Sequence, residues 1–267
     1  MKAWHFIGIL LPLLGCSHGS PAGNDVQTLN TEAPIVITDS PKPNQKLETQ
    51  KIIKDINEKQ DIKTQPRFKD KKLMNVPLIR QNPELKYGCE VTSLAMMLKY
   101  AGADTNKMKL FRETKKDPDP LKRSSSGDIL SWGNPAEGFV GDMTGRHAGY
   151  AVFDKPMVDL INRYLPGRAV NLTGKNFDEV LKHVSEGYPV VIWTTGDYRM
   201  PDRWESWTHG NEVIKTPLDL HAVVLVGYTD NSVYLNDPLS GRKQVSVNKQ
   251  RFIRTWKAMQ SRAVSYK

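Results

Sequence analysis

Cys89 is the residue whose type and position most clearly indicate chemistry. The chain has two cysteines, and the other, Cys16, lies in an N-terminal segment typical of export. A lone thiol outside the cytoplasm cannot form an intramolecular disulfide, so it needs another reason to be present. Cys89 opens a predicted helix, where the helix dipole favours a thiolate, and Gly88 before it leaves room for a substrate backbone. We therefore predict that Cys89 is a nucleophile, with a buried structural cysteine as the alternative.

A thiol nucleophile needs a base, and histidine is the residue best suited to that role near neutral pH. His221 is preferred because it begins an apolar strand and lies downstream of Cys89 at a spacing within the about 130–150 residues found in one class of thiol enzymes. His209 is the main rival. His147 falls in a loop, and His183 is expected to be solvated on a helix.

Two further polar residues complete the predicted site. Asp237 ends the strand that pairs with the His221 strand, so its carboxylate can hold the imidazole, whereas Asn236 points to the opposite face. Gln81 can donate a side-chain N–H to an oxyanion, together with the backbone N–H of Cys89. The alternatives are a turn-capping aspartate and an ordinary loop glutamine.

A metal centre built from Cys89, His221 and Asp237 is a further alternative. The chain contains neither a CxxC nor an HExxH motif, and the spacing of these three residues is not typical of zinc ligands. We therefore expect no metal and no cofactor at this site.

The first residues are typical of a lipoprotein signal. Lys2 precedes an apolar run that is much shorter than the roughly 20 residues of a membrane-spanning helix, and Cys16 follows at the position of lipidation. We predict a signal peptide over 1–15, lipidation of Cys16, and a location outside the cytoplasm, anchored to the bacterial cell membrane. An ordinary cleaved signal is the alternative.

The rest of the chain divides into a tether and a domain. Residues 16–72 are rich in polar residues, proline and lysine, which predicts a flexible tether, whereas 73–267 have the apolar content of one domain. The formal net charge of +9 suits attraction to an anionic membrane or wall surface, with an ordinary solvated surface as the alternative explanation of so modest an excess. Without a basic stripe interleaved with aromatics, nucleic-acid binding is not expected.

Helices precede strands in the domain, which predicts an α+β fold. Apolar residues at helical spacing predict helices over 89–101, from Pro156, from Asn176 and from Asn248. Continuous or alternating apolar runs predict strands over 189–193, 221–228, 232–237 and 243–247, the last three as an antiparallel unit. The nucleophile then lies at the N-terminus of a helical half that packs on an antiparallel sheet.

These motifs, in this order, resemble the bacteriocin-processing-peptidase-like branch of the papain-fold cysteine peptidases, which is allied to cysteine peptidase family thirty-nine and includes secreted and lipoprotein members. The segments that carry the resemblance are 76–81, 87–94, 187–191, 221–228, and 236–238 with Gly241. The resemblance covers about 73–267 and implies a papain-like fold with Cys89 as nucleophile, His221 as base, Asp237 as orienting acid and Gln81 as oxyanion donor. Transporter-linked relatives cleave leader peptides in the cytoplasm, so that activity is not expected here.

These features predict a surface-anchored thiol hydrolase that cleaves peptide or amide bonds and acts as a monomer. Trp204 and Trp207, with the loop 194–217, are expected to line the substrate side of its cleft, whereas Trp193 is expected in the core. One alternative is a catalytically silent lipoprotein that binds peptides or wall fragments. Another is an acyl transferase, or a hydrolase of peptidoglycan stem peptides, that uses the same residues.

Overall fold

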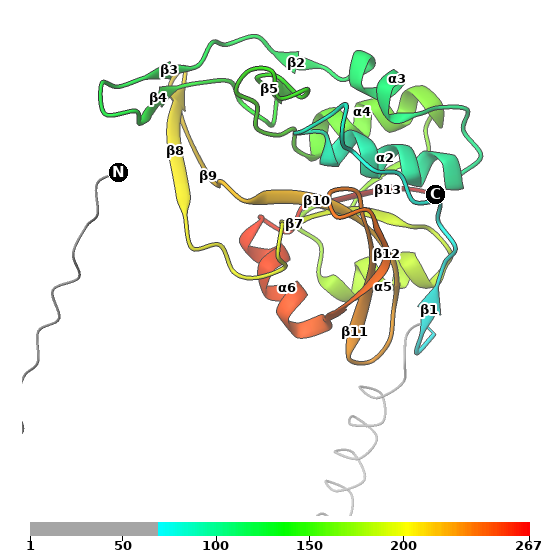
Figure 1. Ribbon diagram of the computed structural model, residues 1–267. Coiled ribbons are helices and arrows are strands. Elements are labelled where there is room, and N and C mark those ends of the chain that lie inside the picture. The colour runs from blue at the N-terminus through cyan, green and yellow to red at the C-terminus, as the bar shows by residue number, and fades with distance from the viewer. Residues whose placement is uncertain (1–68) are drawn as a thin grey trace, which may run out of the picture. The chain divides into compact units, whose positions relative to one another are not determined.

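A seven-stranded antiparallel sheet organises the fold. Its long strand β10 (Leu220–Tyr228) carries the candidate base His221 near its start. The computed structural model describes residues 69–267 (Figure 1). The predicted signal peptide, Cys16 and nearly all of the predicted tether therefore lie outside the described residues. The order of the main path is β12-β11-β10-β7-β13-β6, and β1 pairs with β10 beside that path. Its strands are β1 (Lys72–Leu73), β6 (Ala169–Asn171), β7 (Val190–Thr195), β10, β11 (Ser232–Asp237), β12 (Arg242–Asn248) and β13 (Ala263–Tyr266).

Helices cover both faces of this sheet (Figure 1). They are α2 (Cys89–Tyr100), α3 (Lys107–Glu113), α4 (Asp154–Tyr164), α5 (Phe177–Ser185) and α6 (Lys249–Ala258). Because successive side chains of a strand point to opposite faces, Ile192 packs with α5 and α6 while Trp193 packs with α2 and α4. The sheet therefore has an apolar core on each face, and the burial of apolar surface in these two cores stabilises it.

The helix starts follow the sequence signals closely. Asn176 caps α5 by accepting a hydrogen bond from the Glu179 backbone, and Asn248 caps α6 by accepting one from Arg251. Each cap satisfies a backbone N–H that the first turn of a helix leaves without a partner. The α4 helix begins at Asp154, two residues before the predicted start at Pro156.

A second sheet was not predicted. The expectation of a loop over 194–217 is wrong, because β8 (Trp204–His209) and β9 (Glu212–Pro217) form a hairpin in that stretch. The hairpin extends a sheet with β3 (Lys122–Arg123) and β4 (Ile129–Ser131). Most hairpin side chains are at least partly exposed, so the apolar alternation that signals a strand is weak there.

The stretch 103–150 is more ordered than its sequence suggests. It contains α3, β3, β4 and a small parallel pair of strands, β2 (Lys116–Asp117) and β5 (Phe139–Val140). These strands are only two or three residues long, which is too short for a period to be read from sequence. In the part of the chain that the structure describes, no helix is both long and apolar enough to span a bilayer.

Candidate active site

The helix that begins at Cys89 packs directly on the strand that carries His221. The Ser93 hydroxyl, one turn after Cys89 on the same side of α2, donates a hydrogen bond to the Ala222 carbonyl at 3.1 Å. The backbone of Ala222 also interacts with the Cys89 thiol. The structure therefore brings the predicted nucleophile to the residue next to the predicted base.

His221 and Asp237 form a buried pair. His221 Nε2 lies 2.8 Å from Asp237 Oδ1, and each side chain is only 4% exposed. The pairing arises because β10 and β11 are antiparallel neighbours, so the end of one strand reaches the start of the other. Asn236 points to the other face, as expected, where its amide donates to the Val76 carbonyl at 3.0 Å.

Several donors hold the Asp237 carboxylate in place. Oδ2 accepts hydrogen bonds from the Ser240 hydroxyl at 2.5 Å and the Tyr198 hydroxyl at 3.1 Å, and Oδ1 accepts the Leu239 N–H at 2.9 Å. Burial raises the pKa of Asp237, but the hydrogen bond and charge of His221, with the hydrogen bonds from Ser240 and Leu239, outweigh it and hold the pKa well below its usual range. The carboxylate therefore stays ionised and keeps the imidazole in one orientation.

The Cys89 thiol is neutral in this arrangement. Cys89 is 6% exposed, and its Sγ donates a hydrogen bond to Glu90 Oε2 at 3.3 Å. Burial raises the pKa of the thiol well above its ordinary value, the charge of Glu90 raises it further, and the Ala222 backbone acts in the opposite direction. The thiol must therefore turn away from Glu90 before it can react as a thiolate.

Glu90 is a site residue that the sequence analysis did not single out. Its side chain is fully buried, and its Oε1 accepts the Val152 N–H at 3.1 Å. Burial raises its pKa to about 7, against the hydrogen bonds that it accepts. Its sequence signal is an acidic residue followed by eight uncharged and mostly apolar residues, 91–98, all of which are buried in the structure. A carboxyl group in such surroundings titrates near neutral pH beside the nucleophile.

Gln81 lies between the segment that precedes Cys89 and the turn that follows Asp237. Its backbone N–H donates to the Pro238 carbonyl at 3.0 Å, and its side-chain amide donates to the Lys86 carbonyl at 2.8 Å. The side chain is buried, and Oε1 has no hydrogen-bond partner among residues 69–267. These contacts fix the amide close to the segment that leads into Cys89.

The structure explains Gly88 by packing. A Cβ atom at this position would lie 2.5 Å from the Leu85 Cβ, closer than such atoms approach each other. The predicted role of Gly88, to admit a substrate backbone, is therefore not needed to account for the glycine.

The three tryptophans expected near the cleft occupy different environments. Trp193 is fully buried in the core, as expected. Trp207 is 2% exposed and packs against Trp132 and Tyr150, with its indole N–H bonded to the Gly133 carbonyl. It therefore lies in a small core of the second sheet and has little surface to offer to a substrate. Trp204 is 43% exposed on β8 and is free to contact one.

The remaining histidines lie in three settings. His147 is exposed, as expected for a loop residue. The expectation that His183 is solvated is wrong, because its side chain is buried and its Nε2 lies 2.9 Å from the Ser265 hydroxyl and 3.0 Å from the Tyr266 carbonyl. His209, the rival base, lies at the end of β8 among three carboxylates, 3.2 Å from Asp117.

Comparison with known proteins decides the family. The sequence model of the Peptidase_C39 like family matches residues 73–264, which is most of the chain. The chain belongs to this family. The resemblance drawn from the motifs is therefore confirmed.

Two proteins are similar to this chain over more than two thirds of its length. The uncharacterised protein YvpB of Bacillus subtilis (strain 168) is 37% identical over 182 residues, which are 68% of this chain and 70% of YvpB. The crystal structure of a proposed C39-like peptidase from Bacillus anthracis matches with a TM-score of 0.68 and 43% identity, over 74% of this chain and 98% of that one. The predicted α+β fold is confirmed, and it is shared with the solved structure of a C39-like peptidase.

Proposed function

We propose that this C39-like protein is a thiol hydrolase that cleaves peptide or amide bonds with Cys89 as nucleophile, His221 as base and Asp237 as orienting acid. The observation that carries the proposal is the buried His221–Asp237 pair, 2.8 Å apart, beside a helix that begins with a cysteine. Because Asp237 engages Nε2, the proton-exchanging nitrogen of His221 is Nδ1.

The reaction follows from these residues. His221 takes the proton of the Cys89 thiol, and the thiolate attacks the substrate carbonyl to form a C–S bond and an oxyanion. The oxyanion collapses, the C–N bond breaks, and His221 returns the proton to the leaving amine. Water, deprotonated by His221, then hydrolyses the thioester and regenerates the thiol.

Gln81 is the oxyanion donor in this proposal. Its buried amide and the backbone N–H of Cys89 are the donors assigned to the oxyanion. A pre-oriented donor is worth more than a mobile one because it costs no reorganisation as charge develops on the carbonyl oxygen. The hydrogen bond to Lys86 uses one amide hydrogen and leaves the other for the oxyanion.

The hydrolase is tested by peptide cleavage with single variants. A mixture of unstructured peptides is incubated with the protein and with its Cys89→Ala variant, and new termini are identified by mass spectrometry. We expect cleavage by the wild type and none by Cys89→Ala, with circular dichroism showing that both are folded. Equal cleavage by the two proteins would refute the assignment of Cys89.

We also propose that the protein is lipidated at Cys16 and held outside the cytoplasm at the bacterial cell membrane, where peptides or peptidoglycan stem peptides are its substrates. The apolar run before Cys16 and the basic net charge support this location. Mass spectrometry of the N-terminal peptide from the membrane fraction tests this proposal. An unmodified N-terminus downstream of Cys16 would contradict a lipid anchor.

A further inference from the structure

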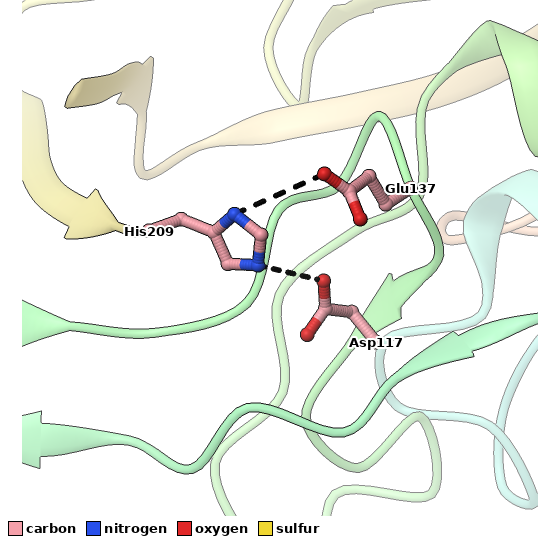
Figure 2. Close-up of side chains that lie close together, drawn as sticks. All are labelled: Asp117, Glu137 and His209. Carbon is pink, nitrogen blue, oxygen red and sulfur yellow. Dashed lines mark ion pairs between the residues drawn. The ribbon is translucent and has the colours of Figure 1, made fainter. Parts of the chain in front are cut away.

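His209 is surrounded by carboxylates on both of its ring nitrogens (Figure 2). Its Nε2 lies 3.2 Å from Asp117 Oδ2 and 3.4 Å from Asp119 Oδ2, and its Nδ1 lies 3.9 Å from Glu137 Oε1. One ligand atom each from Asp117, Glu137 and His209 lie within 4.8 Å of one another. These residues come from β2, from the segment after β4 and from the end of β8, so the cluster joins three separate segments.

The cluster carries more negative than positive charge. Within 69–267, none of Asp117, Asp119 and Glu137 forms an ion pair with a lysine or arginine. A protonated His209 would supply one positive charge against three negative ones. Carboxylates that share a site in this way repel each other unless a cation lies between them.

The surrounding backbone is shaped around Asp117. Its side chain is 3% exposed, its Oδ1 accepts the Asp119 N–H at 2.9 Å, and its Oδ2 accepts the Asn134 N–H at 3.1 Å. A Cβ atom at Gly133 would lie 2.8 Å from Asp117 Oδ1, and one at Gly138 would lie 2.6 Å from the Asp117 backbone N. The two glycines thus let the chain close around a carboxylate whose orientation is fixed before any ion binds.

Solvent can reach the cluster. Asp117 and Asp119 line a cavity of about 570 Å³, and the Asp119 and Glu137 side chains are each 55% exposed. A cation can therefore enter from the cavity, and the two exposed carboxylates have the freedom to adjust to it.

We propose that these residues form a binding site for a divalent transition-metal ion such as Zn²⁺, with His209 Nε2, Asp117 and Asp119 as ligands. Imidazole nitrogen with carboxylate oxygens is a donor set that Zn²⁺ accepts, and water fills the remaining position. Glu137 Oε1 lies 3.9 Å from His209 Nδ1, and a small movement of this exposed side chain would let it accept the Nδ1–H and fix the ring and its tautomer, as carboxylates beside metal-bound histidines do. The ion links the β8–β9 hairpin to β2.

The test is zinc titration of the full chain carrying Cys16→Ser and Cys89→Ser, which removes both thiols as competing ligands. Isothermal calorimetry with ZnCl₂ alone is compared among this protein and versions that also carry His209→Ala, Asp119→Asn or Glu137→Gln. Asp159→Asn on α4, an exposed aspartate outside the cluster, is the matched control.

We expect one Zn²⁺ per chain in the parent and in Asp159→Asn. Binding should be lost in His209→Ala and weaker in Asp119→Asn, and it should be about 10- to 100-fold weaker in Glu137→Gln. The ion should also raise the melting temperature of the parent and leave that of His209→Ala unchanged.

Absence of saturable zinc binding by the parent would overturn the proposal, as would equal affinity in the parent and Asp119→Asn. The second comparison decides the matter even if His209→Ala does not fold, because the Asp119 side chain is more than half exposed and its loss leaves the core intact.

Discussion

Replacement of Glu90 by glutamine should make the Cys89 thiol easier to ionise, and the effect should appear only above neutral pH. Glu90 accepts the hydrogen bond from Cys89 at 3.3 Å and is fully buried, so its charge acts on the sulfur with little screening. Its pKa is raised to about 7. Below that pH the carboxyl is neutral and glutamine resembles it, whereas above it the carboxylate opposes a thiolate.

The magnitude follows from the distance. Two unit charges 3.3 Å apart repel by about 5 kcal/mol at an effective dielectric constant of about 20. A thiolate that turns toward His221 lies farther from Glu90, and at about twice the distance the repulsion is about 2.5 kcal/mol. Since one pKa unit corresponds to about 1.4 kcal/mol, Glu90→Gln should lower the pKa of Cys89 by about 2 units.

The assay is the rate of Cys89 alkylation by iodoacetamide, measured across pH by intact-protein mass spectrometry. The ratio of the Glu90→Gln rate to the wild-type rate should be near one at about pH 5.5 and should rise by up to ~100-fold above about pH 8. Glu179→Gln, an exposed glutamate on α5, is the matched control and should follow the wild type throughout.

A ratio that stays near one across the whole pH range would refute this reasoning, because it would mean that the Glu90 charge does not reach the thiol. A ratio that is large and independent of pH would also refute it. In that case glutamine would act by changing the packing of α2 rather than by removing a titrating charge.

Three further predictions rest on the same structure. The folded state raises the pKa of Glu90 from 4.5 to about 7, so this residue lowers the free energy of unfolding as pH rises from 4.5 to about 7. Glu90→Gln should therefore be more stable than the wild type by up to about 3 kcal/mol at about pH 8, and equally stable near pH 4. Urea unfolding at the two pH values measures this difference. Gly88→Ala should destabilise the fold by about 1–3 kcal/mol because its Cβ would collide with Leu85, and unchanged urea stability would contradict that contact. Trp207→Ala should lower the free energy of unfolding by about 3–5 kcal/mol because this side chain is buried. Trp204→Ala should leave the melting temperature almost unchanged and weaken only peptide cleavage. Equal melting temperatures of the two variants would contradict their different burial.

The parts of the fold that sequence reasoning reached are those with a strong local pattern. The apolar run of β10 and the capping residues of α5 and α6 each identify one element by themselves. The β8–β9 hairpin escaped because it buries few side chains, and the short β6 and β13 carry too few residues for a period to appear.

The candidate site divides in the same way. The pairing of His221 with Asp237 follows from two antiparallel strands and strict alternation, so sequence could reach it. The environment of Cys89 could not be predicted, because its burial and the direction of its hydrogen bond depend on how α2 packs against β10. The carboxylates around His209 precede it in the chain by many residues, and sequence carries no signal that they meet it.

The measurement that tests the central claim most directly is the alkylation rate of Cys89 at about pH 6 in the wild type and in His221→Ala. At this pH Glu90 is mostly neutral, so its charge does not oppose the thiolate, and the reactivity of the buried thiol depends on His221 as the group that takes its proton. We predict fast labelling of the wild type and of His147→Ala, an exposed control, and slow labelling of His221→Ala. Equal rates in all three proteins, rising with pH as for a free thiol, would contradict the claim that His221 activates Cys89.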